Sequence, residues 1–211
     1  GAEIAKALHG AGAEVALSGT RTAPLEALAA ELGDHAHVLP CNLSDADAVN
    51  ALPKQAIDAM GAVDILVNNA GITRDNLFMR MSEEEWASVL DVNLTATMRL
   101  CKGVIRGMMK SRWGRIVNIS SVVGATGNPG QANYGAAKSG IATFSQIAAK
   151  ELSRYDVLSN CIAPGARTRL TLATPGLEEI MTPKDGAFDE WDPANISPLV
   201  AYLSTTDCRF T

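Results

Sequence analysis

Short apolar runs alternate with longer stretches of helical periodicity along this chain, and that alternation constrains its fold more than any other feature. Several of the runs lack a polar–apolar alternation, which is typical of strands covered on both faces. Short strands that alternate with longer helices are typical of an α/β domain with a mostly parallel sheet. The sequence predicts strands at Glu14–Ser18, His37–Cys41, Val63–Val67, Gly114–Ser120 and Val157–Ile162.

The stretches between these runs are predicted as helices. Ser82 followed three residues later by Glu85 is typical of a capping box, which marks a helix start. The predicted helices are Ala2–Ala11, Pro24–Leu32, Asp45–Met60, Glu83–Lys110 and Asn133–Arg154, with a last one around Ala194–Leu203.

The segment after Pro164 breaks this rhythm. Thr, Pro, Gly and Asp are frequent there as far as Asp192, which predicts a long loop with one short helix at most. Loops at the carboxyl ends of parallel strands line the ligand crevice. Residues 165–193 are therefore predicted to form a substrate lid.

Composition excludes several classes of protein. The 211 residues fit one domain, 1–211, and the net charge of −5 gives no basic footprint for a nucleic acid. No apolar stretch reaches the 18 residues of a membrane span, and the first residues do not resemble a signal peptide. The four cysteines are widely spaced, which favours reduced thiols and a cytoplasmic location. The three histidines have no arrangement suited to a metal.

Tyr134 and Lys138 lie four residues apart and so share one face of a predicted helix. Taken alone, such a pair is usually an ordinary pair of helix neighbours. An ammonium beside a phenol nevertheless favours the phenolate, and one charge about 4 Å away supplies energy of the required order. Ser121, thirteen residues before the tyrosine, follows a predicted strand. Together the three residues are typical of a proton-transfer site for a carbonyl or an alcohol.

The surrounding motifs favour the functional interpretation. NNAG at 68–71 follows the apolar run that ends at Val67, and Asn93 lies in DVNLTA. With Ser121, Tyr134 and Lys138, these motifs resemble the short-chain dehydrogenase/reductase family from Gly1 to about Gly165. NNAGITRDNLFMRM and GNPGQANY resemble, within that family, the bacterial 3-oxoacyl-[acyl-carrier-protein] reductases. The resemblance implies a Rossmann-type, doubly wound parallel sheet.

The resemblance also implies residue roles. Ser121, rather than its neighbour Ser120, would hold the substrate oxygen, Tyr134 would transfer the proton, and Lys138 would lower the pKa of the tyrosine and contact the nicotinamide ribose. Asn93 would hold a water in a proton relay, and Arg112 would help to dock an acidic acyl carrier protein. The cofactor would contact Gly1, Thr20, Arg21, Asn42, Leu43, Asn69, Ala70, Gly71, Tyr134, Lys138, Pro164, Gly165 and Thr168.

Residues 18–21, SGTR, bear on the choice of cofactor. NAD-preferring relatives usually carry an acid after the second strand, where it binds the ribose hydroxyls. This chain has no acid there, and Arg21 could pair with a 2′-phosphate. We therefore expect NADP(H) rather than NAD(H).

The chain departs from the family pattern in two places. Gly1 aligns with the last glycine of the family's phosphate-binding turn, so we expect the first family strand to be missing, which would leave unpaired edges on both its neighbours. Thr211 likewise precedes the family's last strand, and we expect a fragment of a longer reductase. Second, Arg169 occupies a usual threonine position, and the stretch from ARTRLT to SPLVAYLS resembles enzymes acting on hydroxyacyl-CoA.

The sequence predicts NADPH-dependent reduction of a 3-oxoacyl thioester. One alternative is a dehydrogenase of hydroxyacyl-CoA, steroids or other secondary alcohols with the same site. Another is a truncated binding module without catalysis. By resemblance we also expect a homotetramer formed through the helices Glu83–Lys110 and Asn133–Arg154.

Overall fold

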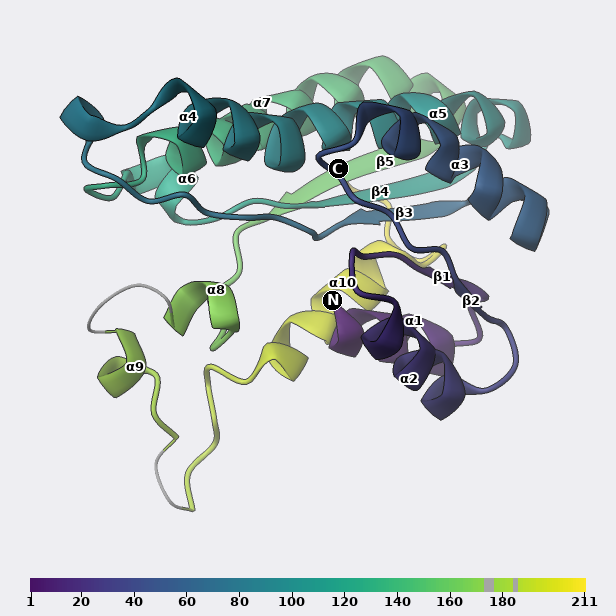
Figure 1. Cartoon of the computed structure of the whole chain (residues 1–211). Helices are drawn as coiled ribbons and strands as arrows, with labels where there is room; N and C mark the ends of the chain where they lie inside the picture. The colour runs from purple at the N-terminus through teal and green to yellow at the C-terminus, as the bar shows by residue number, and fades with distance from the viewer. Residues whose placement is uncertain (173–176, 184–185) are drawn as a thin grey trace.

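The computed structural model describes residues 1–172, 177–183 and 186–211, and Figure 1 shows its parallel strands with helices on both sides. The strands are β1 (Val15–Leu17), β2 (Ala36–Val38), β3 (Ile65–Asn68), β4 (Gly114–Ile119) and β5 (Val157–Ile162). The longer helices are α1 (Ala2–Gly10), α2 (Thr22–Leu32), α3 (Ala46–Met60), α4 (Glu83–Leu90), α5 (Ala96–Ser111) and α7 (Ala132–Leu152). The shorter ones are α6 (Val123–Thr126), α8 (Arg169–Leu172), α9 (Leu177–Ile180) and α10 (Ser197–Leu203), with 3₁₀ turns at Phe78–Arg80, Ser153–Tyr155 and Pro193–Ile196.

The strands form two parallel sheets. One pairs β1 with β2, and the other has the order β3-β4-β5. Residues of β1, such as Leu17, and of β3, such as Leu66, line an apolar cleft of about 660 Å³. The parallel α/β architecture is confirmed, and the division between β1 and β3 lies where the sequence predicted unpaired strand edges.

Helices cover both faces of the three-stranded sheet. On one face, Cys101, Val104 and Met108 of α5 pack with Ile116 of β4 and Leu152 of α7. On the other face, α1 and α10 lie against β4, where they bury Ile4, Val117, Ile119, Val200 and Leu203. This packing explains the apolar runs of the sequence, because β4 is buried along its whole length.

The prediction of one continuous α-helix over Glu83–Lys110 is wrong in the middle of that range. A π-helical turn, Asp91–Thr95, separates α4 from α5. Asn93 in this turn is fully buried, and its side-chain amide bonds both the N–H and the C=O of Ile72. Single π-helical turns occur inside α-helices frequently at functional sites. At the start of α4, the predicted capping box of Ser82 and Glu85 is confirmed.

The segment predicted as a lid contains more helix than expected. It forms the one-turn helices α8 and α9, which Figure 1 shows apart from the main body, and then leads into α10. Residues 173–176 and 184–185 of the predicted lid lie outside the described residues. The expected final helix around Ala194–Leu203 begins as the 3₁₀ turn Pro193–Ile196.

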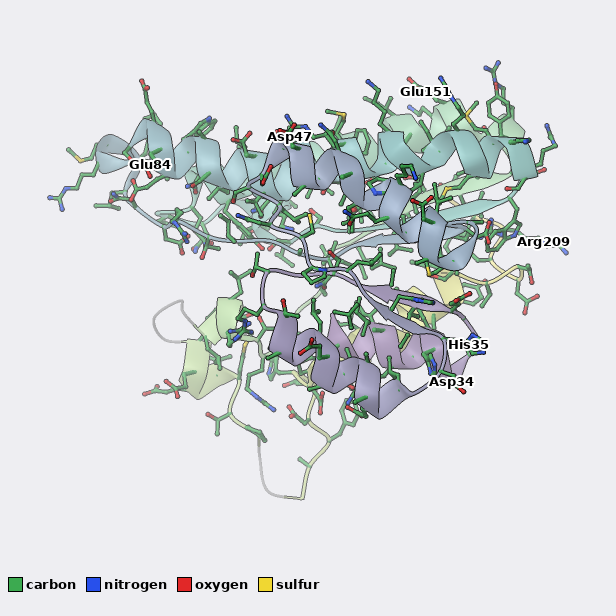
Figure 2. All side chains as sticks on the ribbon, turned by 45° about the vertical axis from the view of Figure 1, so that its right-hand side comes forward. Asp34, His35, Asp47, Glu84, Glu151 and Arg209 are labelled. Atoms are coloured by element: carbon green, nitrogen blue, oxygen red, sulfur yellow. The ribbon has the colours of Figure 1, made fainter. Side chains whose placement is uncertain are left out.

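The outer surface of the helical layer over the three-stranded sheet carries acidic side chains. Figure 2 shows Glu84 of α4, Asp47 of α3 and Glu151 of α7 pointing away from the sheet. Within the described part of the chain, no helix has the length and apolar character that crossing a membrane requires.

Arg115 ties the C-terminal segment to the start of β4. It is only 5% exposed, and its guanidinium donates to the carbonyls of Thr205 (3.0 Å), Cys208 (3.3 Å), Gly114 (3.0 Å) and Asp156 (3.4 Å). Replacement by leucine leaves these carbonyls without their charged donor. We expect Arg115→Leu to lower the free energy of unfolding by about 3 kcal/mol, measured by urea denaturation.

The exposed Arg209 is the matched control, because it belongs to the same C-terminal segment. Arg209→Leu should leave the free energy of unfolding within about 0.5 kcal/mol of wild type. Equal urea midpoints for Arg115→Leu and Arg209→Leu would contradict this role of the buried arginine.

Candidate active site

The predicted catalytic residues converge beyond the carboxyl ends of β3 and β4. Tyr134 stands in the first turn of α7, is 7% exposed and packs with Val89 and Ala137. Ser121 directly follows the end of β4, and Lys138 lies one helical turn after the tyrosine. The sequence folds this way locally because β4 ends where α7 begins to cross it, which brings the strand end and the helix start together.

Ser120 and Ser121 have different surroundings. The hydroxyl of Ser120 is buried and donates to the backbone carbonyl of Lys138 at 2.7 Å, which fastens α7 to the end of β4. The hydroxyl of Ser121 is half-buried and accepts from the N–H of Val123 at 3.2 Å. The neighbouring hydroxyl of Ser121 also acts to lower the pKa of the Tyr134 phenol. The geometry leaves Ser121 as the serine that faces the tyrosine.

Lys138 is a buried ammonium close to the phenol ring. Its Nζ lies 5.6 Å from the centroid of the Tyr134 ring and donates to the carbonyl of Ile119 at 2.7 Å. Burial lowers the pKa of Lys138 to about 8. An ammonium has three donors, and among the described residues Ile119 receives one of them. The others are available to a ligand.

The pKa of Tyr134 differs from the sequence-based expectation. Burial raises it above the ordinary phenol value, the hydroxyl of Ser121 acts to lower it, and the carboxylate of Asp75 raises it further. The expected lowering by Lys138 is not seen: its ammonium donates to the carbonyl of Ile119, and desolvation of the phenol outweighs the effect of Ser121. Burial thus makes the phenolate of Tyr134 less favourable in this structure.

Asn93 reaches the site through the loop after β3. Its side chain accepts from the N–H of Ile72 at 2.8 Å and donates to its carbonyl at 2.9 Å. Gly71 is pressed against this amide, because a Cβ there would lie 3.0 Å from Oδ1 of Asn93 and 3.6 Å from Nζ of Lys138. Glycine thus allows the loop to pass beside both polar side chains.

The sequence did not single out Asn133, which the structure places at the centre of the site's support. It is fully buried; its Oδ1 accepts from the N–H of Tyr134 at 2.7 Å, and its Nδ2 donates to the carbonyls of Arg74 (2.9 Å) and Glu85 (3.0 Å). It therefore joins the first turn of α7 to α4 and to the loop after β3. An asparagine in the first turn of a helix, where backbone N–H groups lack partners, was the available signal.

Some of the predicted cofactor residues come together in the cleft between the sheets. Gly1, Leu43, Asn69 and Ala70 line it, and a Cβ on Gly1 would lie 2.9 Å from Nδ2 of Asn69. The other residues of that predicted set lie outside the cleft lining: Thr20, Arg21, Asn42, Gly71, Tyr134, Lys138, Pro164, Gly165 and Thr168. Of these, Thr20 and Arg21 are exposed beyond β1, Asn42 is exposed beyond β2, and Pro164 and Gly165 follow β5.

These features fit a nicotinamide dinucleotide. The unspent donors of the buried Lys138 suit ribose hydroxyls, and the close approaches at Gly1 and Gly71 suit a ligand held against backbone. The exposed Arg21 offers a guanidinium at the end of β1, where an anionic group could be paired.

Arg112 is not brought to this site. It precedes β4, whereas Ser121 follows it, so the six-residue strand separates them by about 20 Å. Its guanidinium donates to the carbonyl of Arg154 at 3.0 Å and lies 3.6 Å from the carboxylate of Asp156. Arg112 and Arg154 thus share one end of the molecule, remote from Tyr134.

Comparison with known proteins agrees with this geometry. The family profile described as short chain dehydrogenase matches residues 1–175. Nodulation protein G of Rhizobium sp. is 54% identical over 165 residues, which cover 78% of this chain and 67% of the relative.

Several relatives carry the name 3-oxoacyl-[acyl-carrier-protein] reductase, including one from Vibrio cholerae and one from Escherichia coli. The protein of Vibrio cholerae is 42% identical over 217 aligned positions that cover all of this chain and 87% of the relative. That of Escherichia coli is 45% identical over 165 residues, or 78% of this chain and 68% of the relative.

Proposed function

Because the chain belongs to the family of short chain dehydrogenases, which are NAD(P)-dependent oxidoreductases, we propose that it reduces a 3-oxoacyl thioester to the 3-hydroxyacyl thioester with NADPH. The observation that carries the proposal is the convergence of Ser121, Tyr134 and Lys138 beside the loop that Asn93 holds. We treat residues 1–211 as one catalytic domain.

The chain's own residues would hold the ketone and supply a proton. The hydroxyl of Ser121 donates a hydrogen bond to the ketone oxygen and so fixes it beside Tyr134. The phenol of Tyr134 then gives its proton to that oxygen as negative charge develops there. Lys138 binds the ribose through its unspent donors and stabilises the phenolate left behind. Asn93 holds the loop beside Lys138 in place, and a proton from solvent water would restore the phenol after each turnover.

The nicotinamide, when bound, supplies the hydride for the ketone carbon. A proton donor has to be protonated before it acts, and the raised pKa of Tyr134 keeps the phenol in that form. A catalytic base for alcohol oxidation would need the opposite shift.

The thioester, rather than the carrier protein, is the part of the substrate for which the described site offers support. Arg112 and Arg154 would suit an acidic carrier protein, but they lie at the far end of β4 from Tyr134. We therefore propose that acyl thioesters bound to CoA are accepted as well as those bound to a carrier protein.

The test compares the rates of NADPH oxidation with three substrates that each carry a ketone to be reduced. Acetoacetyl-CoA and acetoacetyl-carrier protein should both be reduced, with a simple ketone far slower. A preference for oxidising 3-hydroxybutyryl-CoA or a steroid alcohol would favour the dehydrogenase alternative. Binding of NADPH without turnover of any substrate would favour the non-catalytic alternative.

Arg21 carries the proposed preference for NADPH. Removal of its guanidinium should raise KM for NADPH about tenfold and leave KM for NADH unchanged, because only NADPH has the 2′-phosphate that arginine pairs with. Steady-state kinetics of Arg21→Ala with both cofactors measures this.

Arg209→Ala is the control, since Arg209 is an exposed arginine of the C-terminal segment that does not line the cleft between the sheets. Its two KM values should match wild type. An equal rise of both KM values in Arg21→Ala would show that Arg21 supports the fold of the loop and not the phosphate.

We propose that the enzyme assembles as a homotetramer through the outer faces of α4, α5 and α7. The support is apolar surface on these helices: Trp86 and Met98 are each 39% exposed, and Ile147 is 50% exposed. An interface through these helices would cover the three exposed apolar side chains.

A further inference from the structure

Arg167 joins three passes of the chain at the base of the segment that follows β5. Its guanidinium forms a two-pronged ion pair with Asp189, with Nη2 to Oδ2 at 2.5 Å and Nη1 to Oδ1 at 3.1 Å. Nη1 also donates to the carbonyl of Met181 at 2.7 Å, and the backbone N–H of Arg167 donates to the carbonyl of Trp191 at 2.7 Å. A bidentate pair of this kind fixes both the distance and the relative orientation of the two side chains.

The ion pair is reinforced on the side of Asp189. Its Oδ1 accepts from the N–H of Trp191 at 3.2 Å, and its backbone carbonyl accepts from Asn195 at 2.8 Å. The ring of Trp191 lies against Gly165, where a Cβ would come within 3.0 Å of it. Arg167 lowers the pKa of Asp189, which keeps the pair ionised at neutral pH. These contacts fix the two legs of the segment to each other.

The helix α8 begins two residues after Arg167 and packs against the apolar cluster that contains Tyr134. The hydroxyl of Thr168 accepts from the N–H of Thr171 at 3.3 Å, and the hydroxyl of Thr171 donates to the carbonyl of Ala166 at 2.8 Å. This turn presents Leu170 to the apolar cluster that contains Tyr134. A continuous series of contacts therefore runs from Asp189 through Arg167 and α8 to the surroundings of the phenol.

We propose that the Arg167–Asp189 ion pair is a positioning clasp that holds Leu170 against the Tyr134 cluster and thereby sets how tightly the acyl substrate is bound. The inference rests on the proposed function, since the bound group is taken to be an acyl thioester. The clasp touches neither the phenol nor the ammonium. Its loss should act on substrate binding and spare proton transfer.

Steady-state kinetics with acetoacetyl-CoA tests the clasp. Arg167→Met and Asp189→Asn should each raise KM for the thioester about fivefold to tenfold with kcat nearly unchanged. The exchanged pair, Arg167→Asp with Asp189→Arg, should recover part of the affinity, because the charges again face each other. Leu170→Ala should raise the same KM, and Leu172→Ala, whose side chain is 38% exposed on the same helix, should not.

Hydrogen exchange measured by mass spectrometry gives a readout that needs no turnover. Amides of residues 165–172 and 189–192 should exchange faster in Arg167→Met than in wild type, and Arg167→Lys should lie between them. Unchanged exchange in Arg167→Met would overturn the clasp whether or not the protein reduces thioesters. If Arg167→Met exchanges faster but the wild-type protein turns over no thioester, the clasp stands and the proposed function is contradicted.

A kinetic result can also overturn the inference. If kcat falls with KM unchanged in Asp189→Asn, the pair acts on the chemical step. If Leu170→Ala and Leu172→Ala behave alike, α8 does not transmit the position of the clasp to the site.

Discussion

Tyr134→Phe should lower kcat for the reduction of acetoacetyl-CoA by about 10³-fold, with little change in KM for the thioester or for NADPH. The substitution removes only the phenol oxygen, so the ring keeps its packing with Val89 and Ala137. What is lost is the phenol hydroxyl beside Ser121, which is the proposed proton donor. Single-turnover measurement of hydride transfer would place the defect in the chemical step.

Tyr202→Phe is the matched control, because Tyr202 is 43% exposed on α10 and outside the site. It should retain the wild-type kcat. A Tyr134→Phe enzyme with the rate of Tyr202→Phe would remove the phenol from the mechanism and would leave Ser121 and bound water as the proton source.

The pH dependence of the wild-type rate follows from the same site. The phenol stays protonated through neutral pH, because its pKa is raised, so the first group to titrate on going alkaline is Lys138, with a pKa of about 8. As the pH rises through that value, the ammonium that stabilises the phenolate is lost. We therefore expect kcat/KM to decline above about pH 8 as Lys138 loses its proton, and a pH–rate profile measures this.

The fold class could be predicted from the sequence because strands such as β4 are buried on both faces and carry that burial as an uninterrupted apolar run. The relative positions of Tyr134 and Lys138 could be predicted for a similar reason, since helix geometry fixes residues four apart. Both inferences depend on contacts that are local in the chain or that repeat with a regular period.

Other features depend on partners that no local pattern reveals. The π-helical turn around Asn93 forms because a buried amide meets the backbone of Ile72, 21 residues away. The clasp between Arg167 and Asp189 spans 22 residues. The direction of the Tyr134 pKa shift depends on burial, which outweighs the lowering effect of Ser121. In each case tertiary contacts decide what the local sequence leaves open.

Lys138 should lower the stability of the folded protein, because its charge is buried, although thioester reduction requires it. The ammonium is 3% exposed, and burial lowers its pKa from 10.5 to about 8. At 1.36 kcal/mol per pKa unit, burial of the charge costs about 3 kcal/mol at neutral pH. The loss of the hydrogen bond to Ile119 in Lys138→Met opposes this by about 1 kcal/mol. Lys138→Met should therefore be about 2 kcal/mol more stable than wild type near pH 7 and should have lost thioester reduction.

The sign of the pH dependence gives the sharper test. Between about pH 8 and 10.5 the folded protein releases the Lys138 proton while the unfolded chain keeps it, so wild-type stability rises with pH through this group. The advantage of Lys138→Met should therefore shrink by up to about 3 kcal/mol from neutral to alkaline pH. Urea unfolding of both proteins at each pH measures this, because all other groups cancel in the difference.

Lys150→Met is the control on the same helix, since Lys150 is exposed and its removal relieves no buried charge. Its stability difference from wild type should be small and independent of pH. If the stability difference between Lys138→Met and wild type is also independent of pH, burial does not lower the pKa of Lys138, and the expected cost of burying its charge is contradicted. A variant that is more stable and inactive would instead show that this fold retains a buried charge at the expense of stability because proton transfer at Tyr134 requires it.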